Sequence, residues 1–137
     1  MAQLSVEYFY TETKLTDKVY FGIVIDTLLQ EIAGLDVIFD VSSYLKILNY
    51  YPTGLLSVKN YVDIKDNLIT FSQLTELDKP NFKGKGLIAV LECQPVKVGN
   101  AYLKFNFTLG STIDCNFASK DGKDLLTSVQ NRLLKIV

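Results

Sequence analysis

Residues 35–41 read LDVIFDV, and this stretch decides the fold because every second residue in it is apolar. The apolar set is Leu35, Val37, Phe39 and Val41. Successive side chains of a β-strand point to opposite faces, so these four side chains share one face. The stretches 18–26 (KVYFGIVID) and 101–109 (AYLKFNFTL) repeat the pattern, which in the second of them extends to Leu109. Period-two alternation predicts strands with one buried and one exposed face.

Shorter apolar runs predict further strands at residues 4–10, 45–48, 61–64, 68–74, 88–93 and 112–117. Residues typical of turns separate them at 51–54, 65–67, 83–86, 98–100 and 120–123. Many short strands divided by turn signals are typical of a sandwich or a barrel. The sequence therefore predicts an all-β protein, and of the two architectures we expect a jelly-roll or Ig-like antiparallel β-sandwich of about nine strands. Repeats, low-complexity stretches and linkers are absent from the sequence, so we expect a single domain over residues 1–137.

The C-terminal segment supports two interpretations. Helical spacing is kept by the apolar residues Leu125, Leu126, Val129, Leu133 and Ile136. Asp124 stands before them as a candidate N-cap, so the periodicity alone favours an amphipathic helix. The competing interpretation is two strands, 125–129 and 132–137, joined at Gln130 and Asn131.

The composition excludes several classes of function. Of the 137 residues 48% are hydrophobic, which is too many for a disordered chain. The chain has no histidine, and so it has no Ser-His-Asp or Cys-His catalytic set and no histidine metal cluster. Its net charge of −1 argues against general nucleic-acid binding, which needs a basic face. We therefore expect a protein that is not an enzyme and needs no cofactor or metal.

The sequence also bears on compartment and redox state. The first residues contain no basic stretch followed by an apolar run, and Glu7 interrupts the apolar start, so we expect no signal peptide. No apolar run reaches about 18 residues, the length that a membrane span requires. We expect cytoplasmic synthesis, unless a leader has been removed. Cys93 and Cys115 are interpreted as reduced, buried residues, with a bridge between neighbouring strands as the alternative.

Three polar clusters have simpler explanations than catalysis or ion binding. The acidic stretch 114–124 offers carboxylates to calcium, but two lysines oppose a cation there, and Asp-Gly is typical of a hairpin turn. Residues 83–86 (KGKG) lack the spacing of a phosphate-binding loop. Asp36 and Asp40 lie ~13 Å apart on one strand, wider than the ~5–9.5 Å of paired glycosidase carboxylates.

The candidate binding residues are those expected on outer strand faces. Tyrosine is amphipathic and enriched at interfaces, and apolar residues on a nominally exposed face indicate cover by another chain or by a loop. The candidate contacts for a partner are Asp36, Ile38, Tyr50, Tyr51, Val90 and Tyr102. Tyr8, Tyr10 and Tyr20 also fall in predicted strands.

The order of several stretches resembles that of cohesin domains and the related carbohydrate-binding modules. The stretches are 17–21, 32–39, 41–47, 67–71, 85–93 and 117–122, followed by Asn131 and 136–137. Residues 85–93 (KGLIAVLEC) resemble the most characteristic strand of the family, although Cys93 replaces its aromatic residue. The resemblance implies a sandwich that closes with a strand and uses one sheet face for its partner. On that ground we expect two C-terminal strands rather than a helix.

The resulting hypothesis is a non-catalytic module for protein–protein binding and assembly. Its partners are expected to be proteins in a larger assembly, including a homo-oligomer. A virion is the favoured setting, with the chain as an auxiliary, decoration or neck protein. The alternatives are a cohesin-type scaffold module and a carbohydrate-binding module. Neither nucleic acid nor a membrane is an expected partner.

Overall fold

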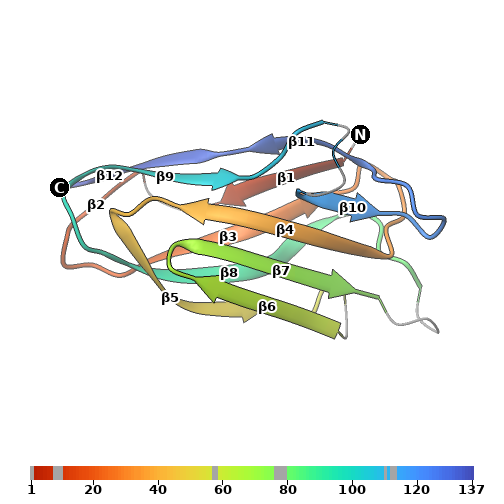
Figure 1. Cartoon of the computed structure of the whole chain (residues 1–137), viewed down its shortest axis with the longest axis horizontal. Coiled ribbons are helices and arrows are strands. Elements are labelled where there is room, and N and C mark those ends of the chain that lie inside the picture. Colours follow the sequence, from red (N-terminus) through yellow and green to blue (C-terminus); the bar gives the residue numbers. More distant parts are fainter. Residues whose placement is uncertain (1, 8–10, 57–58, 76–79, 110, 112–113) are drawn as a thin grey trace.

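The computed structural model describes residues 2–7, 11–56, 59–75, 80–109, 111 and 114–137. In this part of the chain it forms twelve strands and no helix, arranged as two facing sheets (Figure 1). The predicted all-β class and sandwich architecture are confirmed, whereas the expected number of about nine strands is too low. Among the described residues, no helix has the length and apolar character needed to cross a membrane.

The smaller sheet has five strands in the order β11-β1-β3-β8-β5. Their bounds are β1 (Ala2–Glu7), β3 (Val19–Asp26), β5 (Leu45–Pro52), β8 (Lys85–Pro95) and β11 (Leu126–Gln130). Neighbours are antiparallel except for β1 and β11, which run parallel.

The larger sheet has seven strands, six of them in the order β2-β12-β9-β4-β7-β6. Their bounds are β2 (Glu12–Thr13), β4 (Gly34–Val41), β6 (Lys59–Lys65), β7 (Leu68–Leu74), β9 (Gly99–Phe105) and β12 (Arg132–Ile136). The seventh strand, β10 (Asn116–Ala118), pairs with the start of β4. β2 and β12 run parallel, as β1 and β11 do, while the other paired strands are antiparallel, as expected.

The alternation that predicted the strands decides which side chains enter the core. On β4 and β3 the predicted inner sets are buried, with Phe39 and Phe21 fully inaccessible to solvent. The prediction for 101–109 is confirmed as far as Phe105, where the strand ends. Beyond it Phe107 still packs against the core, but Leu109 is 70% exposed. After Phe105 the chain enters a loop, in which the Cys115 amide donates to the Asn106 carbonyl at 3.0 Å. The predicted strands 4–10 and 112–117 are confirmed at 4–7 and 116–117, while 8–10, with Tyr8 and Tyr10, and 112–113 lie outside the described residues.

The C-terminal segment forms two strands, so the helical interpretation is wrong. β11 belongs to the smaller sheet and β12 to the larger one. The chain changes sheets at Asn131, whose side-chain carbonyl accepts a hydrogen bond from the Phe105 amide at 2.8 Å. Leu133, which the helical spacing counted as buried, is 70% exposed. β11 pairs with β1 and β12 pairs with β9, so the backbone of this segment is hydrogen-bonded to distant strands. A short helix without such partners would be only marginally stable.

The core between the sheets consists mainly of leucine, isoleucine and valine, with five phenylalanine rings as its largest side chains. The fully buried rings are Phe21, Phe39, Phe71, Phe105 and Phe117. Phe39 and Phe105, on neighbouring strands of the larger sheet, pack with ring centroids 4.8 Å apart.

Cys93 and Cys115 are free, buried thiols, as expected, and they do not form the disulfide bridge considered as the alternative. Burial raises the pKa of Cys93 to about 12 and that of Cys115 to about 11.

Replacement of Phe39 by alanine tests the importance of this packing. The variant should lose about 3–5 kcal/mol of unfolding free energy, because the change removes buried surface and leaves a cavity. Tyr102→Ala, on the outer face of the same sheet, is the matched control and should change it by within about 0.5 kcal/mol. Urea denaturation followed by circular dichroism measures both. Equal losses in the two variants would contradict the assignment of Phe39 to the core.

Candidate functional site

The structure divides the predicted binding residues between the two outer faces of the sandwich. We call the outward-facing side of β7, β4, β9 and β12 the broad face, and that of the five-stranded sheet the narrow face. Asp36, Ile38 and Tyr102 lie on the broad face. Val90 and Tyr51 pair across β8 and β5 and lie on the narrow face. The six candidates therefore do not form one site.

Tyr50 is not on an outer face, contrary to expectation. The pairing of β5 with β8 shifts by one residue between Ile47 and Asn49, so the inward-facing positions change from odd to even numbers. Tyr50 consequently points inward and packs on the Phe71 ring, with centroids 5.0 Å apart. Its hydroxyl donates to Asn60 Oδ1 at 2.8 Å and accepts from Gln73 Nε2 at 3.1 Å. The burial of Tyr50 raises its pKa.

Large apolar side chains are exposed on the broad face. Leu133 on β12 is 70% exposed and lies directly opposite Tyr102 on β9, which is 42% exposed. Leu68 and Leu74 on β7 are each 43% exposed. Ile38, at the centre, is half-buried and packs against the core. Leu133 and Tyr102 form an adjacent exposed pair, whereas Leu74, opposite Gly34, lies at the other end of β4 from them.

Charged groups cross the broad face between these apolar residues. Asp40 on β4 lies opposite Lys104 on β9, and the Ser72 hydroxyl donates to the carboxylate of Asp36. The broad face therefore combines apolar contact area with charges of both signs. This mixture is typical of surfaces that bind proteins reversibly.

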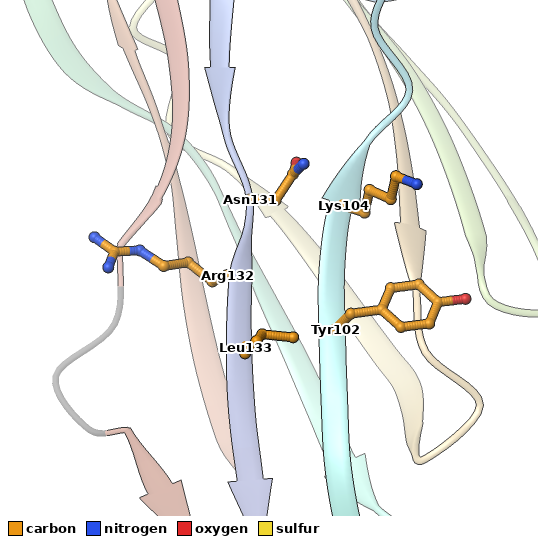
Figure 2. Close-up of a pocket in the computed structure, with 5 residues that line it drawn as sticks. All are labelled: Tyr102, Lys104, Asn131, Arg132 and Leu133. Atoms are coloured by element: carbon orange, nitrogen blue, oxygen red, sulfur yellow. The ribbon is translucent and has the colours of Figure 1, made fainter.

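A groove of about 510 Å³ runs along this face where β12 pairs with β9 (Figure 2). Its lining residues are Tyr102, Lys104, Asn131, Arg132 and Leu133. Figure 2 shows the side chains of Leu133 and Tyr102 next to each other, whereas Arg132 points away toward β1, where its Nε donates to the Val6 carbonyl at 3.0 Å. Lys104 also lines a second groove, of about 350 Å³, that continues toward Leu68 and Asp40. The two grooves therefore share Lys104 in their walls.

The narrow face is organised around a carboxylate. Glu92 on β8 is only 7% exposed, and its oxygens accept hydrogen bonds from Asn49 Nδ2 at 2.6 Å and from the Tyr20 hydroxyl at 2.7 Å. The hydrogen bond from Asn49, followed by that from Tyr20, lowers the pKa of Glu92. These bonds join β3, β8 and β5 across the sheet, so the polar groups at its centre are already engaged within the chain.

The three polar clusters considered for ions or catalysis stabilise loops and strands. The Asp124 carboxylate accepts from the amides of Phe117 and Leu126, and Asp114 accepts from the amide of Thr108. The Gly84 amide of the KGKG stretch donates to Thr27 Oγ1 at 2.8 Å. Asp36 and Asp40 lie on the outer side of β4, as expected. In the part of the chain that the structure describes, no three His, Cys, Asp or Glu residues cluster as a metal site would require.

The sequence analysis did not identify several exposed apolar residues of the broad face. Leu68 and Leu74 belong to a run with apolar residues on both faces of the strand, and this departure from alternation was the available signal. Leu133 belongs to the apolar stripe of the helical interpretation, and the expectation of two strands did not place it on an exposed face. Its exposure depends on the change of sheet at Asn131, which has no local sequence signature.

No protein-family model and no curated protein matches the sequence, so the comparisons rest on solved structures. The third ScaC cohesin of Acetivibrio cellulolyticus, solved with the ScaB dockerin, has a TM-score of 0.80 at 12% identity over 100% of this chain and 99% of its own. A cohesin in the Coh-OlpA-Doc918 complex of Clostridium thermocellum has a TM-score of 0.78 at 13% identity, covering 99% of both chains. The non-cellulosomal cohesin of Archaeoglobus fulgidus has a TM-score of 0.76 at 11% identity over 99% and 91%. The expected cohesin-like fold is therefore confirmed.

The lowered pKa of Glu92 makes the folded protein sensitive to acid. Because folding favours the ionised form, the stabilisation is present above the ordinary glutamate pKa of about 4.3 and is lost as the pH falls through the lower folded value. Glu92→Gln should lower the urea midpoint at pH 7 and reduce its fall between about pH 5 and about pH 3. Glu31→Gln, at an exposed position, is the control and should keep the wild-type slope. A slope unchanged in Glu92→Gln would contradict the role of the carboxylate.

Proposed function

We propose that this chain is a non-catalytic protein-binding module that docks its partner on the broad face. The observation that carries the proposal is the exposed pair Leu133 and Tyr102, which lies beside a groove and next to Lys104. Clustered exposed apolar groups with polar neighbours on a rigid sheet are a feature of protein interfaces. A preorganised sheet also loses little conformational entropy on binding.

The structural neighbours support a cohesin-type role within this proposal. Two of the similar cohesins are complexed with dockerins, which are protein partners. A scaffold module that captures one protein domain on a sheet face is therefore the finer function we propose. The similarities lend no support to the virion setting, so the proposal does not include it.

A carbohydrate-binding module is the second candidate, and one observation favours it. Tyr20 and Tyr51, each 48% exposed, flank Glu92 and Asn49 on the narrow face, and aromatic rings beside polar groups suit a sugar. However, the Tyr20 hydroxyl and both Glu92 oxygens are already hydrogen-bonded within the chain. Few groups remain to orient a glycan, so the broad face supports protein binding better.

Capture experiments with variants of the two faces test this function. The immobilised wild-type chain should retain a defined protein from an extract of its source organism. Tyr102→Asp combined with Leu133→Asp should weaken that binding by at least tenfold, about 1.4 kcal/mol, because the charges disrupt the apolar contact. Tyr51→Asp, on the narrow face, is the matched control and should bind as the wild type does. Unchanged thermal unfolding would show that all variants remain folded.

Three results would overturn the proposal. In one, the broad-face variant retains the same protein as strongly as the wild type. In another, only Tyr51→Asp loses it. In the third, no protein is retained and the wild type instead binds oligosaccharides on a glycan array, with loss of binding in Tyr51→Asp. That last result would establish the carbohydrate-binding alternative.

A further inference from the structure

The sheet edges differ in how they are protected from other strands. An exposed edge presents unpaired N–H and C=O groups, and natural proteins protect such edges with bulges, proline, charge or short strands. β5 has an irregular register and ends at Pro52. β2 has only two residues, and β11 has five, mostly polar ones. These three edges are therefore poor templates for pairing.

β6 is protected only by charge, through Lys59, Asp63 and Lys65, and it has no bulge, proline or shortened length. It is seven residues long, pairs with β7 without a register shift, and contains no proline. In its middle, Tyr61 is 59% exposed, Val62 46% and Ile64 42%. Tyr61 faces outward, whereas Val62 and Ile64 are on the inner side of the sheet, so apolar surface is exposed on both faces of the edge.

The turn after β6 determines which backbone groups are unpaired. The hairpin loop consists of only Asp66 and Asn67, so Lys65 and Leu68 form the hydrogen-bonded pair that closes it. Hydrogen bonds alternate along an antiparallel pair, so β7 also engages the N–H and C=O groups of Asp63 and Tyr61. The corresponding groups of Val62 and Ile64 point away from β7. In the described part of the chain, β6 has no neighbouring strand other than β7.

We propose that β6 pairs antiparallel with β6 of a second copy of this chain, about a two-fold axis at Val62. This register sets Val62 opposite its own copy and Asn60 opposite Ile64. It also sets Tyr61 opposite Asp63 twice, where each tyrosine hydroxyl can donate to a carboxylate across the strands. The seven-stranded sheets of the two copies then become one continuous sheet. Such an interface is isologous and closed, the commonest form of homodimer.

The chemistry of the strand favours a second copy over an unrelated strand. Any extended segment gains the backbone hydrogen bonds, but Tyr61 and Asp63 flank Val62 symmetrically, so a copy satisfies both pairs at once. In the proposed register Lys59 stands opposite Lys65 of the second copy at each end of the paired strands, a repulsion between like charges that salt reduces. The net charge of −1 leaves little repulsion between copies. Tyr102 and Leu133 lie on β9 and β12, and β4 and β7 separate them from β6, so dimerisation does not cover this pair.

A proline substitution at Val62 separates dimerisation from folding. The Val62 N–H points away from β7, so Val62→Pro removes a donor to the second copy without removing a β6–β7 hydrogen bond. Light scattering coupled to gel filtration should show the wild type at twice the mass of one chain at high concentration. Val62→Pro should be a monomer, with a dimer dissociation constant raised at least tenfold. Val62→Thr keeps the N–H and the β-branched shape, and should remain dimeric.

Asp63→Lys provides a second, milder test at an exposed position. It removes the acceptor opposite Tyr61 and should raise the dissociation constant while circular dichroism stays that of the wild type. In the wild type, the Val62 and Ile64 amides should exchange with deuterium more slowly at high than at low protein concentration. A wild type that is monomeric up to about 1 mM, or a folded Val62→Pro that still dimerises, would overturn the proposal. So would a monomer that binds a foreign strand at β6.

Discussion

Burial of every second side chain along the central strands is the constraint from which the other features of this sandwich follow. A slip of one residue on β4 would place Asp40 in the core and turn Phe39 into solvent. Because the two sheets fill the same interior, the register of each strand is set by the facing sheet as well as by its own neighbours. Packing in the core therefore determines which residues are exposed on the two outer faces.

The two chain ends reinforce this arrangement in the same way. The N-terminal segment contributes β1 to one sheet and β2 to the other, and the C-terminal segment does the same with β11 and β12. The two segments run side by side in the same direction, which explains both parallel pairs. Each segment ties the sheets together near one side of the sandwich. The opposite side is bounded by β5 and β6, where the Tyr50 hydroxyl of β5 donates to Asn60 of β6, and it carries the exposed β6 edge.

The surfaces of the molecule consequently have different chemistry. On the narrow face, Glu92 joins three strands and uses its hydrogen-bonding capacity within the chain. On the broad face, large apolar groups such as Leu133 and Tyr102 are exposed beside charged residues. The β6 edge adds unpaired backbone groups, a third kind of contact. The broad face would contact a partner through side chains, whereas the β6 edge would contact one through backbone hydrogen bonds. One small sandwich can therefore bind two partners at once.

Alternation within 35–41 and 18–26 was sufficient to predict the strands, their buried faces and the all-β class, because the direction of a side chain along a strand is a local property. The order of the stretches was enough to indicate the cohesin-like fold.

Features that depend on contacts between distant residues were not predicted. The helical spacing of 125–136 was overridden by pairing with distant strands. A one-residue shift on β5 turned Tyr50 inward. The separation of Val90 from Ile38 followed from which sheet each strand joined. The sequence by itself determined the central strands and which of their faces is apolar. Only the tertiary structure decided which outer faces and edges are left exposed, because that depends on hydrogen bonds and packing between residues far apart in the chain.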